Sequence, residues 1–566
     1  MKETMKNFDH AKKLTIKLVC LLTTFSIMGC DPGQPEADSG YSASGYAAPL
    51  SQAEFNALPP EDQYHVASKL YGTLFRGISA DDFFDLYAGT ANLSPKSKTF
   101  LTDTKKALQT TLSNDEVLAL DTVIEGFDEE GNANEDDAKY SFDDDTRPDQ
   151  DEKARQIPLA RIKEYPISRD LYVQWMAYFL SNTIMYSPAV EMETTDNVDA
   201  QNMYRFLASK IKDGASVRDM IRSNLPSLAR WRVSRSSENH ALEAYELYLG
   251  LFETEEDSVK GGIACKDFYL TDEDSGYVLS TTNFPNTEPQ LVLDTYFITT
   301  CDDLYDVISG HPLVMPRAVE VLVNYFFSGR SREDRVNIIN SIVSSGAQSY
   351  EDIFTAMLFS KEYLLNTERP RSFEESLMPL LDALKWDPAP AGNGTVGKPI
   401  FENMASSYRG SVLYLGNKGW HSMTLKIGRL PDVPLDALSF ANYHKAVREQ
   451  LLLNEGSYNG RQLDVPGLIY KGEGDDADDN VRDVIAQMSL TDYIHFLFLN
   501  TMQRKASAEE INGLISIYDG LNYLTTDDDG IQIIRPSTSN TNHDNIAEVT
   551  FDYISRLPEF YYFKAI

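Results

Sequence analysis

Two carboxylates, Glu243 and Glu246, lie three residues apart in the stretch 237–248, and Asn239 precedes them by one helical turn. Residues three and four apart are neighbours on one face of a helix, so these polar groups would project from the same side. Either carboxylate could act as a general acid or base, which would fit a hydrolase of envelope polymers. The same pattern also fits two simpler roles: a solvated acidic face, or a buried polar network.

A buried network requires partners, because an unpaired carboxylate in a packed interior costs free energy. Three arginines precede the helix and could fold back as bidentate donors: Arg230, Arg232 and Arg235. We therefore predict a network that holds the core helices in register. Its predicted members are Asn239, Glu243, Glu246, Arg232 and Arg235.

The helix that would position these groups is amphipathic. At the helical period, Ala241, Ala244, Tyr245, Tyr248 and Phe252 fall on one stripe, and the polar groups fall on the opposite face. The apolar stripe is expected to face the core.

The sequence around this helix resembles a known bacterial family. Glu238, Asn239, Ala241, Glu243, Glu246 and Leu247 match the motif Asn-Glu-Asn-x-Ala-Arg-Glu-x-x-Glu-Leu of the family catalogued as domain of unknown function 1800. Further fragments are similar to it in the same order: 253–257, His311-Pro312, 356–363, 397–401 and Gly419-Trp420. The resemblance spans residues 170–565 and implies an exported protein of helical fold.

The chain also departs from that family. Leu242 stands where the family has arginine, and 178–182 lacks both histidines of the family's Trp-His-Asn-His-Phe-like segment. If those histidines carry chemistry in relatives, this chain has lost it. The resemblance therefore favours a non-catalytic cell-envelope protein that binds or organises another exported protein. Because relatives are often encoded beside a second exported family, domain of unknown function 1501, a member of that family is an expected partner.

The N-terminus has the pattern of an export signal. Three lysines precede an apolar run, 18–29, that is too short to span a membrane. The run ends at Ile27-Met28-Gly29-Cys30, which resembles a bacterial lipobox. We expect Cys30 to be lipidated and to anchor the chain to the bacterial envelope, at a membrane that the sequence leaves open.

Cysteine usage agrees with export. Cys20 lies in the signal and Cys30 takes the lipid, so Cys265 and Cys301 remain and are expected to form a disulfide. Two cysteines without nearby histidines supply too few ligands for a zinc site. No metal and no cofactor are predicted, because the chain has no His-Glu-x-x-His motif, no Gly-x-Ser-x-Gly motif and no glycine-rich phosphate loop.

The overall charge of the chain argues against polyanionic partners. The 566 residues carry a formal charge of −35, which repels nucleic acid and anionic lipid surfaces. The hydrophobic content of 42% suits a packed globular protein.

The predicted fold is mainly α, an irregular multi-helical domain with appended helical-hairpin units and at most a small β-hairpin. The hairpin units rest on a recurring pattern of a basic residue, a serine cap and an acid three residues later, at Ser79, Ser331 and Ser507. The predicted segments are a signal peptide (1–29), a lipidated tether (30–60), an N-terminal helical unit (61–124), an acidic loop (125–155), a family-like helical core (156–385), a loop-rich segment with a short hairpin (386–480) and a C-terminal helical unit (481–566).

Overall fold

Many helices of this protein begin at a serine or threonine whose side chain accepts a hydrogen bond from a backbone N–H of the first turn. This cap satisfies one of the amide donors that a helix start leaves without an intrahelical partner. The residues that cap in this way include Ser51, Ser168, Ser216, Ser227, Ser236, Thr300, Ser331, Ser349, Ser489 and Ser507. Local sequence therefore fixes where much of the helical structure starts.

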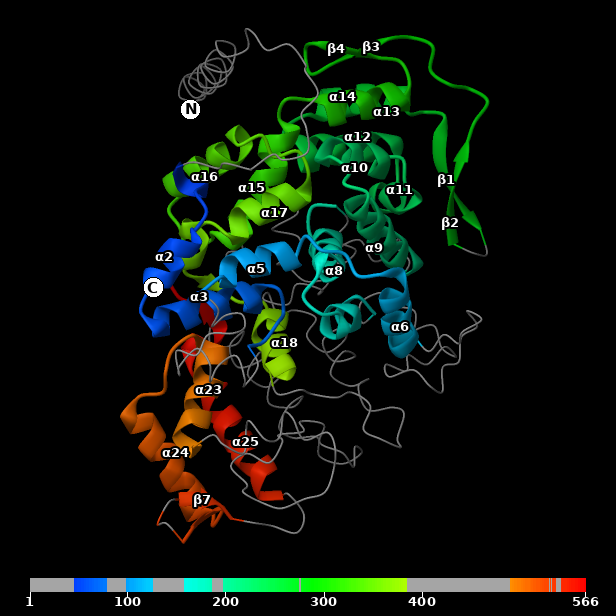
Figure 1. Ribbon diagram of the computed structural model, residues 1–566. Helices are drawn as coiled ribbons and strands as arrows, with labels where there is room; N and C mark the ends of the chain where they lie inside the picture. The colour runs from blue at the N-terminus through cyan, green and yellow to red at the C-terminus, as the bar shows by residue number, and fades with distance from the viewer. Residues whose placement is uncertain are drawn as a thin grey trace, which may run out of the picture. The chain divides into compact units, whose positions relative to one another are not determined.

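The computed structural model describes residues 45–78, 98–125, 157–185, 197–273, 276–383, 489–528, 530, 532–535 and 541–566 (Figure 1). All of them belong to the unit Ala43–Ile566, and the unit Met1–Ser42 lies outside them. The fold is mainly α, as predicted from the sequence. In the part that the structure describes, no helix is long and apolar enough to cross a membrane.

The N-terminal part and the core are built from helices. The N-terminal elements are η1 (Gly45–Ala47), α2 (Gln52–Ala57), α3 (Pro60–Thr73), α5 (Phe100–Ala107) and α6 (Asn114–Glu125). After a helix at 157–164 come α8 (Arg169–Ser181), α9 (Asn197–Lys212), α10 (Val217–Asn224), α11 (Leu228–Ser234), α12 (Ser237–Leu249) and α13 (Glu255–Ala264).

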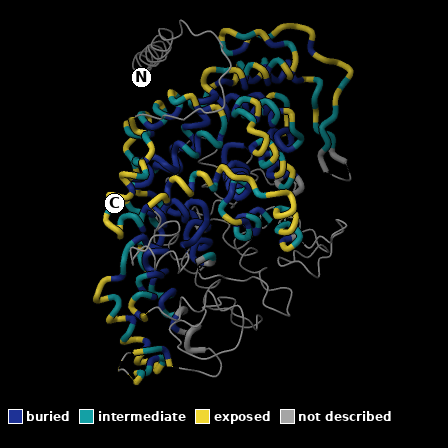
Figure 2. Tube along the Cα trace, in the orientation of Figure 1, coloured by how far each residue is buried: buried dark blue, intermediate teal, exposed yellow. Residues whose placement is uncertain are grey.

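Aromatic rings from distant helices form part of the core. Trp175 and Phe179 of α8 pack against Phe326 and Phe354, with ring centroids 5.1 to 6.2 Å apart. All four side chains are buried, so these rings form a packed part of the interior. Figure 2 shows this interior as dark blue.

The stretch between the two cysteines holds two short hairpins. β1 (Phe268–Glu273) pairs with β2 (Gly276–Thr281), and β3 (Gln290–Val292) pairs with β4 (Tyr296–Ile298), both antiparallel. Before the first hairpin, residues 255–264 form the helix α13. The short hairpin expected within 386–480 falls outside the described residues.

Two helical units repeat with the same dimensions. In the first, α15 (Val314–Phe326) and α16 (Arg332–Ser344) have 13 residues each, and in the second, α23 (Leu490–Met502) and α24 (Ala508–Gly520) also have 13 each. Ser331 and Ser507 cap the second helix of each unit. The two later hairpin units predicted from the sequence are therefore confirmed, while Ser79 of the first lies outside the described residues.

Each unit continues to a short strand, and these strands pair with each other. The first unit runs through α17 (Tyr350–Leu358) and η3 (Glu362–Asn366) to β5 (Arg369–Pro370), which α18 (Phe373–Ala383) follows. The second runs through β6 (Leu524–Thr526), β7 (Gln532–Ile534), α25 (Thr541–Ile554) and η4 (Pro558–Tyr561) to β8 (Tyr562–Phe563). β5 pairs with β8 antiparallel, which joins the C-terminal end of the chain to the core.

Candidate functional site

The helix α12 carries the residues that the sequence singles out. It begins after Ser236, and it ends at Gly250, whose φ of 68° is the left-handed conformation that glycine adopts without strain. Ala241, Ala244, Tyr245 and Tyr248 are buried as predicted. The prediction for Phe252 was wrong: it lies beyond the end of α12, and 47% of it is exposed.

The polar face of α12 contains an ion pair that holds it to α11. The Arg230 Nη2 donates to Glu243 Oε2 at 2.9 Å, and Asn239 Nδ2 donates to Glu243 Oε1 at 3.3 Å. Asn239 also donates to the Ser234 carbonyl at 2.7 Å, across the turn between the helices. The Arg230 side chain is 1% exposed and that of Glu243 14%. Part of the predicted network, Asn239 with Glu243 and an arginine, therefore exists.

Two of the predicted arginines take other positions. Arg232 is buried, but it forms an ion pair with Asp199 of α9, at 3.3 Å from Nη1 to Oδ2. Arg235 is exposed, so its predicted place in a buried network is wrong. The cause is the turn: Arg235 is the left-handed cap of α11, with φ 68°, and the chain reverses there toward α12. Glu246 is half-buried on the same face as Glu243, so it is not part of a fully buried network either.

His240 lies one helical turn before Glu243 on α12, and its side chain is buried against Trp231 and Tyr305. Its ring stacks on Trp231 at a centroid distance of 4.3 Å and meets Tyr305 edge-on at 5.7 Å. Burial, and then the nearby charge of Arg230, lower the pKa of His240 to about 3, so the ring is neutral at physiological pH. His240 was not among the site residues predicted from the sequence. Its spacing of four and seven residues from Ala244 and Leu247 could have placed it on the buried side of α12.

A second polar cluster lies in the core. The sequence patterns did not predict that its charged residues would be buried. Arg369 of β5 binds Glu375 of α18 through two nitrogens, Nη1 to Oε2 at 2.8 Å and Nη2 to Oε1 at 2.6 Å. The two side chains are 1% and 2% exposed. Glu375 also accepts from the Ser372 N–H at 2.9 Å, and Ser372 Oγ accepts from the Glu375 N–H at 3.2 Å, which together form a capping box.

Other charged groups complete this core cluster. Lys69 of α3 is buried and donates through Nζ to the Thr367 carbonyl. Burial, together with the charges of Arg369 and Arg371, lowers the pKa of Lys69 well below its usual value. Arg371 and Glu374 are buried in the same region, so the cluster brings two arginines and two glutamates together with Lys69. It joins α3, β5 and α18 in a part of the core that excludes solvent, and this is the arrangement of a structural element.

A pocket of about 480 Å³ lies on the C-terminal helices. It is lined by Arg504, Ser507, Glu509, Glu510, Gly513, Leu514, Ile517 and Tyr553. Arg504 binds Glu510 with both terminal nitrogens at 2.8 Å, and Tyr553 Oη donates to Glu510 at 3.4 Å. Burial alone would raise the pKa of Glu510, but hydrogen bonds from Arg504 and Ser507 outweigh it and hold the pKa at about 2. The carboxylate is therefore ionised and already bound, so it is not a proton donor at neutral pH.

The predicted disulfide is present. Cys265, at the end of α13, is bonded to Cys301, the first residue of α14 (Cys301–Gly310), with an S–S distance of 2.02 Å. Both cysteines are buried. The bond closes residues 266–300, which contain both short hairpins, against the two helices.

The described residues do not assemble a catalytic constellation around α12. Glu243 is bound by Arg230 and Asn239, and His240 projects into the aromatic cluster of Trp231 and Tyr305. Within the described ranges, no group of three or more His, Cys, Asp or Glu residues could hold a metal ion. Cys30, the predicted site of lipidation, lies outside these ranges.

Comparison with known proteins adds no relative to this picture. No protein-family model, no curated protein and no solved structure matches the chain.

Proposed function

We propose that this protein is a non-catalytic lipoprotein of the bacterial cell envelope that binds or organises another exported protein. The observation that carries the proposal is the state of Glu243. This residue matches an acid of the resembled family's motif, and it is bound by a buried arginine and by an amide. A carboxylate in such a salt bridge holds two helices together and is poorly placed to exchange protons with a substrate.

Two features support the envelope location. The lipobox-like Ile27-Met28-Gly29-Cys30 supplies a point of lipid attachment, and the Cys265–Cys301 disulfide suits an oxidising compartment. A lipid-anchored Cys30 would hold the chain at the membrane of the periplasm or the exterior. A second exported protein, for which a member of the domain of unknown function 1501 family is our candidate, would then bind it there.

The first experiment tests the anchor. Cells that express the wild-type chain or Cys30→Ala are labelled with an alkyne analogue of palmitate, and the purified proteins are compared. We expect label on the wild type and none on the variant, because Cys30 would be the acylated residue. Equal labelling of both proteins would contradict the proposal.

A second experiment tests the partner and the alternative hydrolase. The lipidated protein is purified from its own envelope under mild detergent, and co-purifying proteins are identified by mass spectrometry. We expect one exported protein at a stoichiometric level. Release of fragments from purified envelope polymers by the wild type, abolished in Glu243→Gln or Glu246→Gln of unchanged stability, would instead support the hydrolase.

A further inference from the structure

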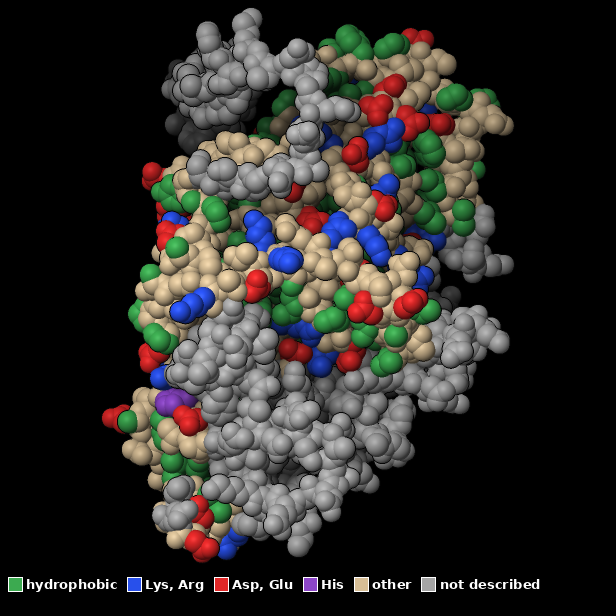
Figure 3. Space-filling model, viewed as in Figure 1, with side chains coloured by type: hydrophobic (Ala, Val, Ile, Leu, Met, Phe, Trp, Pro, Cys, Tyr) green, Lys and Arg blue, Asp and Glu red, His purple; other side chains and the backbone are tan. Residues whose placement is uncertain are grey.

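The part of the structure next to the disulfide exposes an unusual number of apolar side chains. We call this region the clip surface and define it as the exposed residues of 252–313, which includes α13, both hairpins and α14. Its exposed large apolar residues are Phe252, Val259, Ile263, Tyr269, Phe284, Leu291, Phe297 and Leu313. Figure 2 shows the hairpins as a mixture of exposed and intermediate residues, and Figure 3 shows hydrophobic side chains along this end of the molecule. Exposed apolar side chains that gather on one part of a surface are typical of a binding site.

The exposure follows from how the second hairpin packs. Val292 of β3 and Ile298 of β4 are buried, and β3 lies beside α13, where the Leu293 N–H donates to Asp257 at 3.0 Å. Side chains alternate along a strand, so Leu291 and Phe297 point to the other face. These two residues are directly opposite each other in the strand pairing, and 71% of Phe297 is exposed. The hairpin therefore presents an apolar pair, of which Leu291 is 39% exposed and Phe297 is largely exposed.

Phe284, in the connection between β2 and β3, is the most exposed large apolar residue of this region, at 79%. A two-stranded hairpin is marginal when isolated, and here the disulfide fixes both ends of the loop that bears Phe284. A loop that is already fixed loses less conformational entropy when it binds a partner. The disulfide thus has a second use beyond stability, the pre-organisation of a recognition surface.

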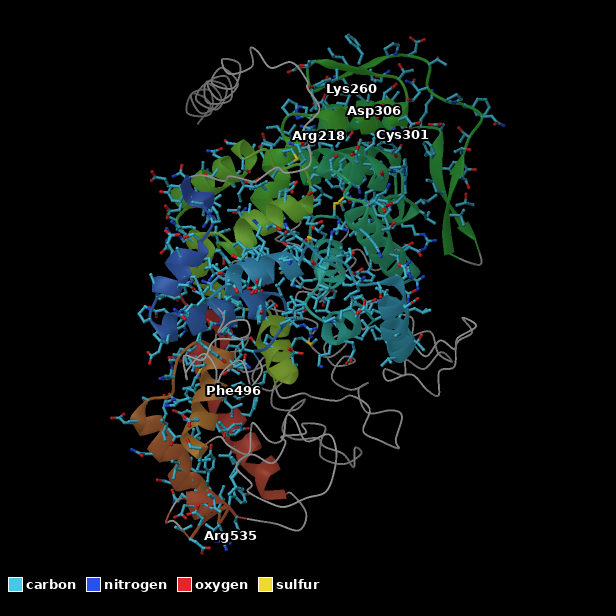
Figure 4. All side chains as sticks on the ribbon, in the orientation of Figure 1. Arg218, Lys260, Cys301, Asp306, Phe496 and Arg535 are labelled. Carbon is cyan, nitrogen blue, oxygen red and sulfur yellow. A yellow bond between two sulfur atoms is a disulfide. The ribbon has the colours of Figure 1, made fainter. Side chains whose placement is uncertain are left out.

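The charge of the clip surface indicates which partner it fits. Residues 253–306 contain 13 Asp and Glu but only 2 Lys, an excess of 11 negative charges from a chain whose net charge is −35. The acids that are exposed around the apolar residues are Glu253, Glu255, Glu256, Glu288, Asp294, Asp302 and Asp306. Three of them take part in ion pairs: Arg222 of α10 binds Asp302 and Asp306, and Lys260 binds Glu256. Lys260 and Asp306 mark this end of the molecule, near Cys301, in Figure 4. Apolar contacts with an acidic rim are complementary to a partner that has apolar residues with a basic rim.

We infer that the clip surface is the docking site for a cationic, amphipathic segment of another exported protein. This inference rests on the proposed function and names the surface that performs it. A membrane would also accept exposed phenylalanines, but the acidic rim repels anionic lipid headgroups and so favours a protein. The apolar pair and Phe284 would supply most of the affinity, and the acids would set the preference for a basic partner.

The test uses the mature chain from Asp31 on, exported with a cleavable signal that adds no lipid, so that the membrane anchor does not interfere. The probe is a fluorescent 14-residue peptide of Leu and Lys at amphipathic helical spacing, and its counterpart has Glu in place of Lys. Fluorescence anisotropy measures binding. We expect the Leu/Lys peptide to bind, the Leu/Glu peptide not to bind, and the affinity to fall as salt is raised.

Matched variants locate the binding. Phe284→Ser with Phe297→Ser should weaken the Leu/Lys peptide about tenfold or more, because truncation of apolar anchors costs this much at an interface. Leu118→Ser removes a side chain that is 60% exposed on α6 and should leave the affinity unchanged. Likewise, Glu288→Lys should weaken binding, and Asp115→Lys on α6 should not. Circular dichroism of each variant checks that the fold is retained.

The remaining outcomes each decide against the inference. Equal affinity of the wild type and the Phe284/Phe297 variant would show that the peptide binds elsewhere. Sedimentation of the wild type, but not of this variant, with vesicles of phosphatidylethanolamine and phosphatidylglycerol would assign the surface to the membrane. Either result leaves the lipoprotein proposal standing, because that proposal depends on the labelling of Cys30 and on the co-purified partner.

Discussion

Arg369 and Arg504 each precede a capping serine by three residues, and each binds the glutamate three residues after that serine with both terminal nitrogens. The likeness extends to small details. Both arginines donate to the carbonyl of the next residue, at 2.9 Å and 3.1 Å, and each glutamate accepts from its capping serine's N–H. A tyrosine hydroxyl donates to each glutamate as well, at 3.2 Å from Tyr325 and 3.4 Å from Tyr553.

The two motifs differ in their surroundings. The side chains of Arg369 and Glu375 are 1% and 2% exposed, whereas those of Arg504 and Glu510 are 26% and 14% exposed. Aromatic rings enclose Arg369, with Tyr325 at 4.9 Å and Phe563 at 4.7 Å from the guanidinium carbon, while Arg504 lies at a pocket. The hydrogen bonds within the motif are the same, although Arg369 also donates to Tyr363 Oη at 2.9 Å and Arg504 also lies 3.7 Å from Glu559. The two ion pairs therefore compare one motif at two levels of exposure to solvent.

The largest expected effect is at the buried pair. Glu375→Gln leaves the charge of Arg369 uncompensated in the core, so we expect the free energy of unfolding to fall by about 3–5 kcal/mol. Urea titration of the purified chain, followed by circular dichroism, measures it. The control is Glu510→Gln, the same change in the exposed motif. Equal losses of unfolding free energy in the two variants would mean that exposure to solvent does not change what the ion pair contributes to stability.

An intermediate effect is expected at α12. Glu243→Gln leaves Arg230 buried but keeps the amide hydrogen bonds possible, and Glu243 itself has partial access to water. We expect a loss of about 2–3 kcal/mol, between those of the other two pairs, because the unpaired charge is on the more buried partner. Thermal melts that place the Tm of this variant above that of Glu375→Gln and below that of Glu510→Gln would support a ranking by burial. A loss greater than that of Glu375→Gln would break it.

The smallest expected effect is at the pocket, and it depends on pH. Glu510→Gln should cost about 0.5–1 kcal/mol at pH 7, since water and salt screen a partly exposed pair. The folded-state pKa of Glu510, about 2, is below its usual value of 4.5. The folded state therefore binds the proton more weakly than the unfolded state. The stabilisation that the ionised Glu510 provides is therefore complete above pH 4.5, and it is lost as the pH falls toward 2.

The difference between wild type and Glu510→Gln should accordingly disappear across that pH range. Urea titrations at pH 7, 4.5, 3 and 2 measure it, with Glu509→Gln, an exposed neighbour on the same helix, as the control. A difference that persists unchanged at pH 2 would contradict the role given to this carboxylate.

Features that depend on neighbours within one or two helical turns could be predicted from the sequence. The capping serines Ser331 and Ser507 and the stripe of α12 from Ala241 to Tyr248 were predicted correctly, as was the pairing of Cys265 with Cys301. Caps and amphipathic periods succeed because their energies come from residues three or four positions away. The disulfide followed from cysteine count, since only one pair remained.

Which charged residues are buried, and which partners they bind, depends on contacts that form only in the folded chain. Three arginines within six residues could have reached Glu243, and the left-handed turn at Arg235 selected Arg230. Likewise, nothing in the spacing of Arg369 and Arg504 shows that the first would be enclosed by β8, whose residues lie almost two hundred positions away. Burial is a property of contacts between distant segments. The same local motif can therefore be a core ion pair in one place and a solvent-facing one in another.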